Sequence, residues 1–187
     1  MTQSRCSWCG DDPLYVDYHD TEWGVPEKND QALFEMLLLE GAQAGLSWIT
    51  VLRKREGYRK LFHQFDPVKM AKMTDQQLET RLQNPAIIRN RLKVFGYRKN
   101  AQAYLKHFSN DGDFSDFIWS FVDHKTRVNR WESLKDIPGS TEESNAMSKA
   151  LKEKGFTFVG STICYAFMQA SGLVNDHLVS CFRHKTD

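Results

Sequence analysis

The chain has 187 residues, 41% of them hydrophobic, and a formal net charge of +1, which excludes a disordered chain and allows one domain with a buried core. No apolar run follows a basic start, so we expect no secretory signal, a cytoplasmic location and four reduced cysteines rather than structural disulfides. The charge is uneven: residues 1–48 hold two basic and nine acidic side chains, and residues 49–187 hold 23 basic and 15 acidic ones.

The segment near the N-terminus is rich in aromatic residues. Aromatic residues make up 12% of the chain, yet the stretch from 8 to 23 contains Trp8, Tyr15, Tyr18 and Trp23. Flat rings with a polar edge suit stacking on a planar heterocycle. The alternative, which is the commoner role for any single ring, is to cover the core.

A helix is predicted to begin at Asn29 or Asp30, since either side chain can cap it. Leu33 and Leu37 belong to its apolar stripe, and Glu40 falls on the same stripe. This geometry points the Glu40 carboxyl into apolar surroundings, which is costly without a partner and marks Glu40 as a candidate site residue. If the helix ends before Glu40, the side chain instead reaches water.

The helix is followed by a glycine-rich turn. Gly41 and Gly45 stand among small residues, and Leu46 is then exposed before Ser47 can cap a new helix. A leucine on such a turn can act as a wedge between DNA base steps. Ordinary loop packing fits the pattern equally well.

Basic residues form two clusters in the rest of the chain. One is RKREGYRK at residues 53–60, and the other, without an acid among them, comprises Arg89, Arg91, Lys93, Arg98 and Lys99. Such clusters suit a polyanion, and a solvated helix face is the alternative.

The central helices carry start and stop signals. Starts are predicted at Asp66-Pro67, Asn84-Pro85, Thr74 with Gln77, and Ser140 with Glu143. Gly155 and Gly172 are typical of helix ends. Residues 156–175 lack charge but are too polar for a membrane span, so we expect a lead-in loop and a buried helix there. We therefore predict one all-α domain over residues 1–187, with its central helical part at roughly 29–172.

Cysteine and histidine occur near both ends of the chain. Cys6, Cys9 and His19 stand at one end, and His177 and Cys181, four residues apart, are expected on one helix face at the other. Two ligands from each end would give zinc a closed four-coordinate site, which is structural rather than catalytic. The spacing leaves open whether Cys6 acts with His19 or with Cys9. Scattered thiols and surface histidines are the alternative.

Four segments carry a family resemblance: DPLYVDYHDTEWGVP, LFEMLLLEGAQAGLSWITVL, DFIWSFV and GFTFVGSTICYAFMQASGLVNDH. Together they resemble the DNA-3-methyladenine glycosylase I family over essentially the whole chain. The resemblance implies an all-helical member of the helix-hairpin-helix glycosylase superfamily. It also implies an enzyme that excises 3-methyladenine from double-stranded alkylated DNA at the start of base excision repair. We expect a monofunctional glycosylase without strand cleavage, acting as a monomer and not bound to a membrane.

The resemblance further implies roles for individual residues. The base pocket would comprise Trp8, Tyr15, Tyr18, Trp23, Glu40 and Trp48. Structural zinc would be bound by Cys6, His19, His177 and Cys181, with Cys9 outside the set. The turn with Gly45 and Leu46 would fill the hole that the flipped base leaves in the duplex. Gly155, Gly160 and Ser161, in a hairpin of the protein, would also contact the DNA. Glu40 would be the catalytic residue, ionised and accepting a hydrogen bond from the flipped base, and Asp176 is not expected to be a catalyst.

Two other functions fit the same residues. A zinc-stabilised module could bind damaged or single-stranded nucleic acid through its aromatic side chains without catalysis. A zinc hydrolase would need an open coordination position on the metal. Release of free methyladenine under turnover separates the glycosylase from the binding module.

Overall fold

Helices make up most of the chain in the computed structural model, which describes residues 3–43 and 45–184. The α-helices are α1 (Pro13–Thr21), α2 (Asp30–Gln43), α3 (Trp48–Leu52), α4 (Arg55–Leu61), α5 (Pro67–Ala71), α6 (Asp75–Leu82), α7 (Arg91–His107), α8 (Asp113–Trp119), α9 (Glu142–Glu153) and α10 (Ser161–Ala170). Short 3-10 helices are η1 (Ser7–Cys9), η2 (His63–Phe65) and η3 (Ser120–Val122). This agrees with the all-α prediction apart from two short strands, β1 (Arg127–Val128) and β2 (Val174–Asn175), which pair in parallel.

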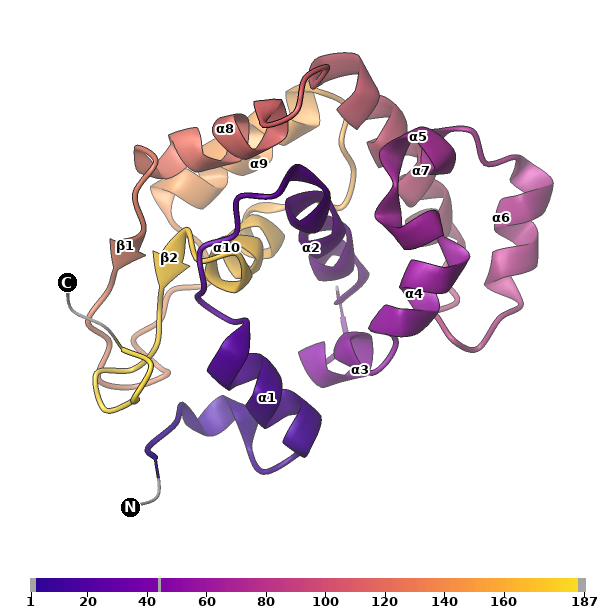
Figure 1. Ribbon diagram of the computed structural model, residues 1–187. Helices are drawn as coiled ribbons and strands as arrows, with labels where there is room; N and C mark the ends of the chain where they lie inside the picture. The colour runs from indigo at the N-terminus through magenta and orange to yellow at the C-terminus, as the bar shows by residue number, and fades with distance from the viewer. Residues whose placement is uncertain (1–2, 44, 185–187) are drawn as a thin grey trace.

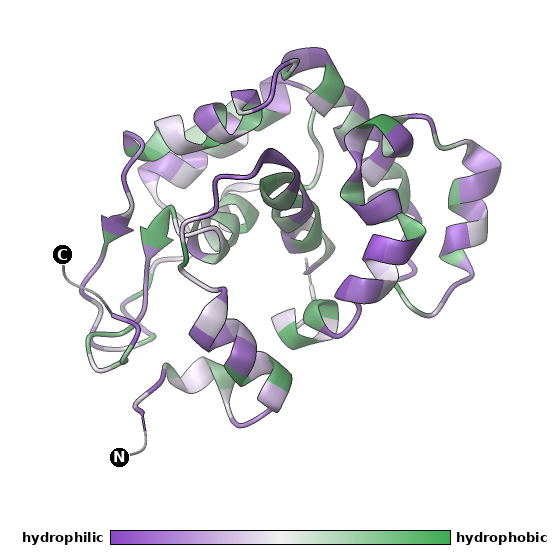
Figure 2. Ribbon diagram, in the orientation of Figure 1, coloured by the Kyte–Doolittle hydropathy of each residue, from purple (hydrophilic) through white to green (hydrophobic). Residues whose placement is uncertain are grey.

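The helices α2 and α10 lie at the centre of the molecule and pack against each other (Figure 1). Helices α8 and α9 lie along one side of this pair, and α4 to α7 form the other side. The central pair is coloured mostly hydrophobic in Figure 2, whereas α6 is mostly hydrophilic. The core accordingly follows α2 and α10, with Phe34, Leu37 and Phe167 fully buried. Among the described residues, no helix is long and apolar enough to cross a membrane.

Several predicted helix boundaries are confirmed. The Asp66 side chain accepts hydrogen bonds from the backbone N–H groups at the start of α5, and Thr74 forms a capping box with Gln77. Gly155 and Gly172, with φ of +91° and +72°, follow the ends of α9 and α10. Each adopts a left-handed conformation that favours glycine.

Two predicted starts are wrong. Asn84 does not begin a helix, because its side chain accepts from Ala86 N–H two residues on and forms a local turn instead. The box expected at Ser140 with Glu143 lies one residue later, where Thr141 caps α9 and pairs with Ser144. Both errors concern side chains that offer the backbone more than one local hydrogen bond.

The segment after α1 is joined to the end of α10. Gly24 N–H donates to the Gln169 carbonyl at 3.0 Å, and Glu27 N–H donates to the Ser171 carbonyl at 3.0 Å. A Cβ atom at Gly172 would lie 2.4 Å from the backbone of Val25, so only glycine permits this approach. These contacts bring residues from both ends of the chain to the same side of the molecule (Figure 1).

The residues from His177 to Cys181 do not form the helix expected from their spacing. They follow β2 as a turn, in which Cys181 N–H donates to the Leu178 carbonyl at 2.7 Å. The turn still brings the His177 and Cys181 side chains together, because a tight turn can place residues i and i+4 side by side, as one turn of a helix does.

Candidate functional site

A cavity of about 190 Å³ lies where α1, α2, α3 and α10 meet. It is lined by Trp8, Tyr15, Tyr18, Trp23, Glu40, Gln43, Trp48, Ile137, Ala166 and Gln169. The structure therefore places together all six side chains predicted for a base pocket. Sequence reasoning missed Gln43, Ile137, Ala166 and Gln169, and nothing in the local pattern marks them.

Aromatic rings form most of the cavity wall. The Trp8 ring lies 4.9 Å from Tyr15 and 5.0 Å from Trp23 between centroids, at interplanar angles of 59° and 67°. Tyr18 and Trp48 are 5.6 Å apart at 44°. None of these three pairs is stacked face to face, and all five rings line the cavity, so a planar ligand that enters it meets aromatic side chains.

Glu40 is the buried acid of this cavity. Helix α2 continues to Gln43, so Glu40 lies inside the helix, and the residue is only 3% exposed. No hydrogen bond joins its carboxyl group to another described residue, and burial raises the pKa of Glu40 from 4.5 to about 8. With nothing bound, the carboxyl is therefore mostly protonated at neutral pH, whereas the sequence predicted an ionised one. A cation entering the cavity would lower this pKa.

The turn after α2 carries an exposed leucine, as predicted. Gly45 has a φ of +83°, and Leu46 is 43% exposed. The turn is held from behind by α7, because the buried Lys93 ammonium donates to the Ala42 carbonyl at 2.8 Å. Lys93 therefore does not belong to the surface cluster expected to meet a polyanion. Its positive charge instead lies at the C-terminal end of α2, where the helix dipole favours it.

The basic cluster at residues 53–60 is largely paired with the acidic N-terminal part. Arg55 binds Glu22 through two hydrogen bonds of 2.5 and 2.8 Å. Arg59 binds Glu35 at 2.7 Å, and Arg53 binds Asp12 at 2.5 Å. These partners explain the uneven charge of the sequence, and they leave this cluster little free charge for a polyanion.

The loop of residues 154–160 joins α9 to α10 as a tight hairpin. Phe158 adopts a φ of +59°, and its side chain packs closely against Gly96 and Gly41. A Cβ atom added at Gly96 would lie 2.9 Å from the Phe158 side chain, and one added at Gly41 would lie 3.2 Å from it. A Cβ added at Gly160 would meet nothing within 4 Å. The backbone that begins α10 is therefore open on the side of the candidate Gly160 and Ser161 contacts.

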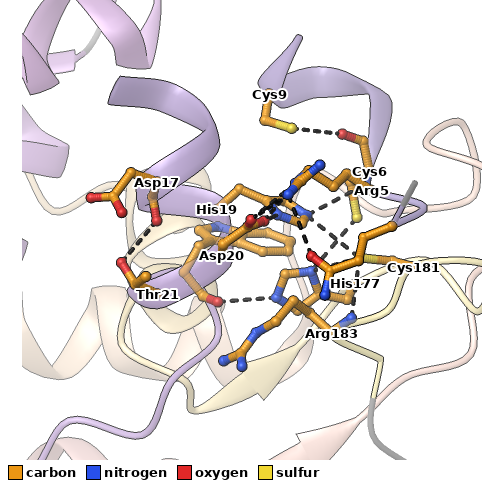
Figure 3. Close-up of polar contacts among 12 residues, drawn as sticks. Arg5, Cys6, Cys9, Asp17, His19, Asp20, Thr21, His177, Cys181 and Arg183 are labelled. Atoms are coloured by element: carbon orange, nitrogen blue, oxygen red, sulfur yellow. Dashed lines mark hydrogen bonds and ion pairs between the residues drawn. The ribbon is translucent and has the colours of Figure 1, made fainter. Parts of the chain in front are cut away.

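A second group of functional side chains lies beside the cavity. Figure 3 shows His19 and His177 turned toward the sulfur atoms of Cys6 and Cys181. All four side chains are buried, and their ligand atoms lie within 4.8 Å of one another. The Cys6 Sγ–His177 Nδ1 distance is 3.7 Å, and Cys181 Sγ is 3.5 Å from His19 Nε2 and from His177 Nδ1. A tetrahedral zinc site with ordinary bond lengths has S–N edges of about 3.6 Å, so this donor set fits zinc.

The remaining nitrogen of each histidine is also held. His19 Nδ1 lies 2.7 Å from Asp20 Oδ1, and His177 Nε2 lies 3.0 Å from the Trp23 carbonyl. Such outer contacts are typical of metal-binding histidines, since they fix the ring orientation. Burial lowers the pKa of both rings, that of His177 to about 4, and raises the pKa of Cys6 to about 12.

Cys9 is placed outside this group. Its Sγ points to the Cys6 carbonyl at 3.2 Å (Figure 3), whereas the clustered donors are Cys6, His19, His177 and Cys181. The alternative that spacing left open, Cys6 with Cys9, has no support in this geometry.

The family model described as methyladenine glycosylase matches residues 8–184. The chain belongs to the methyladenine glycosylase family. Its match covers the aromatic cavity and three of the four clustered donors, His19, His177 and Cys181, whereas Cys6 precedes the matched residues. In this methyladenine glycosylase the buried acid and the rings around it thus lie within one matched region.

Relatives with established names agree with this family. The chain is 58% identical over 177 residues to DNA-3-methyladenine glycosylase 1 of Escherichia coli (strain K12), covering 95% of each chain. It is 57% identical over 178 residues to DNA-3-methyladenine glycosylase of Haemophilus influenzae (strain ATCC 51907 / DSM 11121 / KW20 / Rd), covering 95% of this chain and 96% of the other. A crystal structure of 3-methyladenine DNA glycosylase I superimposes with a TM-score of 0.95 at 56% identity, covering 97% of this chain and 100% of that one. A Staphylococcus aureus structure, described as the basis of 3-methyladenine recognition, gives 0.94 at 36% identity and full coverage of both chains.

Proposed function

We propose that this chain is a monofunctional DNA glycosylase that flips 3-methyladenine out of double-stranded alkylated DNA and hydrolyses its N-glycosidic bond. One observation carries the proposal: Glu40 is buried among aromatic rings in a member of the methyladenine glycosylase family, with no hydrogen-bond partner in residues 3–43 and 45–184. The reaction initiates base excision repair. We also propose that the enzyme acts as a monomer.

Binding of the flipped base offsets the cost of removing it from the duplex. Extrusion costs a few kcal/mol, and stacking returns about 1–3 kcal/mol per base. Methylation at N3 makes the adenine cationic, and rings such as Trp8 and Trp48 attract a cation by about 2 kcal/mol when water is excluded. The arriving cation also favours loss of the Glu40 proton, after which the carboxylate accepts a hydrogen bond from the exocyclic amine.

The chemical step needs little help from an acid. The bond between N9 and the sugar carbon breaks with its electron pair moving to the base, so the cationic 3-methyladenine leaves as a neutral molecule. A water molecule adds to the sugar carbon and releases one proton. The protein therefore contributes selection, orientation and a modest rate gain through Glu40 and the rings.

The hairpin of residues 154–160 and the turn at Leu46 form the proposed DNA contacts. The first N–H groups of α10, after Gly160, are unpaired helix donors that suit a phosphate. The exposed Leu46 side chain fills the gap that the flipped base leaves in the duplex. We propose α9 and α10 as the two helices of a helix-hairpin-helix motif.

Zinc is proposed as a structural ion held by Cys6, His19, His177 and Cys181. When bound, it supplies a fixed tetrahedral link between the two ends of the chain. Four protein ligands leave no coordination position for water, so the ion takes no part in the hydrolysis. The link holds η1 and α1, which carry three rings of the cavity, those of Trp8, Tyr15 and Tyr18.

The direct test is to incubate the protein with DNA treated with a methylating agent and to identify the released base by mass spectrometry. We expect free 3-methyladenine and an unbroken abasic strand. Binding of the DNA without any base release would instead favour the non-catalytic module. Strand cleavage without added base or heat would contradict a monofunctional enzyme.

A further inference from the structure

Asp176 binds four hydrogen-bond donors in the interior of the protein. Its side chain is fully buried. Oδ1 accepts from Asn129 Nδ2 at 2.7 Å and from Trp131 Nε1 at 2.8 Å, and Oδ2 accepts from the Tyr165 hydroxyl at 2.5 Å and from Gln169 Nε2 at 2.8 Å. Both oxygens are thus occupied, which explains why Asp176 is unsuited to act as a base on substrate.

One of these donors, Gln169, also lines the cavity that holds Glu40. Because its amide nitrogen donates to Asp176, the orientation of the amide is set, and a flipped amide would place its oxygen against a carboxylate. The Gln169 Oε1 atom has no hydrogen bond with any described residue. With its nitrogen held by Asp176, the oxygen is the atom of this cavity-lining amide that is left to accept from a ligand.

We infer that Gln169 is a specificity-determining residue whose Oε1 accepts a hydrogen bond from the exocyclic amine of the flipped base, and that Asp176 is the positioning residue that keeps this acceptor in place. The inference rests on the proposed function. It adds a second acceptor to the one that the sequence predicts.

The chemistry of the base supports this assignment. The N–H donors of 3-methyladenine all lie on its exocyclic amine, which has two hydrogens. An acceptor in the cavity can bond nothing else on the base edge, so Glu40 and Gln169 take one hydrogen each. In 3-methylguanine the same ring position carries a carbonyl oxygen, which faces two acceptors and can donate to neither. Unpaired buried polar groups of this kind account for strong discrimination between similar ligands.

The same network predicts the effect of Asp176→Asn. The Trp131 indole N–H can only donate, so the new asparagine must keep its oxygen toward Trp131 and turn its NH2 group toward Gln169. Gln169 then flips to accept from that group, and its own NH2 group turns into the cavity. The substitution thus converts an acceptor for an amine into a donor for a carbonyl oxygen.

The test measures kcat/KM for release of 3-methyladenine and of 3-methylguanine from the same methylated DNA. For Gln169→Leu we expect about a 10- to 100-fold loss for 3-methyladenine, the range for one hydrogen bond in a site of this kind. The loss for 3-methylguanine should be smaller. The exposed Gln76→Leu serves as a matched control. Wild-type kcat/KM for 3-methyladenine in Gln169→Leu would overturn the inference.

Asp176→Asn separates positioning from a merely structural role. We expect 3-methyladenine release to fall and the ratio of 3-methylguanine to 3-methyladenine release to rise by about tenfold or more. A structural defect would lower both rates together and leave this ratio unchanged, which would contradict the role of Asp176. In the Gln169→Leu background, Asp176→Asn should no longer change the ratio. Failure of the wild-type protein to release any base would instead contradict the proposed function itself.

Discussion

The ammonium group of Lys93 on α7 lies 2.8 Å from the carbonyl oxygen of Ala42, at the end of the helix that carries Glu40. This bond connects the core of the protein to the turn that exposes Leu46. A charged hydrogen bond in a buried position contributes about 1.5–3 kcal/mol. The position of the turn therefore depends on a side chain that belongs, in sequence, to a cluster of surface charges.

We predict that Lys93→Met lowers excision from duplex DNA by about tenfold, because the freed Ala42 carbonyl loosens the turn and the wedge at Leu46. Excision from a single strand, which needs no wedge, should change less. Kinetic assays on both substrates measure this difference. Lys106→Met, at the exposed end of the same helix, is the control, and equal losses on both substrates would count against the idea.

Glu40→Gln should strongly weaken base recognition and stabilise the folded protein. Native Glu40 keeps its proton up to a pKa of about 8, whereas in the unfolded chain the group ionises near 4.5, so wild-type stability falls as pH rises between these values. The carboxyl thus costs stability on the order of 3–5 kcal/mol at pH 8. Thermal melting should show a higher Tm for Glu40→Gln at pH 8 and converging values near pH 5. A lower Tm for the variant at pH 8 would contradict this account.

The same pKa predicts how activity depends on pH. The substrate is cationic at every pH tested, and it binds best when Glu40 is ionised. Since the free carboxyl has a pKa of about 8, kcat/KM should rise by up to tenfold per unit from pH 6 to 8 and level off above that. The residual activity of Glu40→Gln should lack this slope. A wild-type profile that is flat across this range would show that Glu40 is already ionised in the free enzyme.

Loss of the proposed zinc ion should destabilise the protein and reduce activity only through the pocket wall. We expect Cys6→Ser to lower zinc content and to reduce Tm, because one ligand of the closed site is removed. Cys9→Ser is the matched control, since its sulfur lies outside the cluster. Zinc analysis and thermal melting of both variants provide the readout. Equal zinc content in wild type and Cys6→Ser would contradict the site.

Local features of the sequence predicted local features of the fold. The apolar periodicity of the segment that forms α2 predicted that Glu40 lies on the buried face. The capping side chains of α5 and α6, Asp66 and Thr74, accept from backbone N–H groups two or three residues further along the chain, so the sequence alone could predict them. Asn84 failed because its side chain has a competing local hydrogen bond. The four clustered donors were proposed from residue type and from family resemblance, and their fit to a tetrahedron required coordinates.

The features that escaped prediction depend on contacts between distant segments. Gln169 looks like an ordinary polar position on α10 until Asp176 turns its amide, and Asp176 itself is fixed by Asn129 and Trp131, more than 40 residues earlier. The charge of Lys93 suggested a surface role, because its burial against α2 depends on how α7 packs. Such relationships carry no local signal in one sequence.

The wall of the cavity is assembled from segments more than 150 residues apart. Trp23 contacts His177, with ring centroids 4.6 Å apart, and its carbonyl lies 3.0 Å from the His177 ring. During synthesis on the ribosome, residues 8–23 must therefore wait for residue 177 before this wall can close. A nascent or prematurely terminated chain without that residue would carry the basic helices yet lack the contact that supports Trp23 from behind.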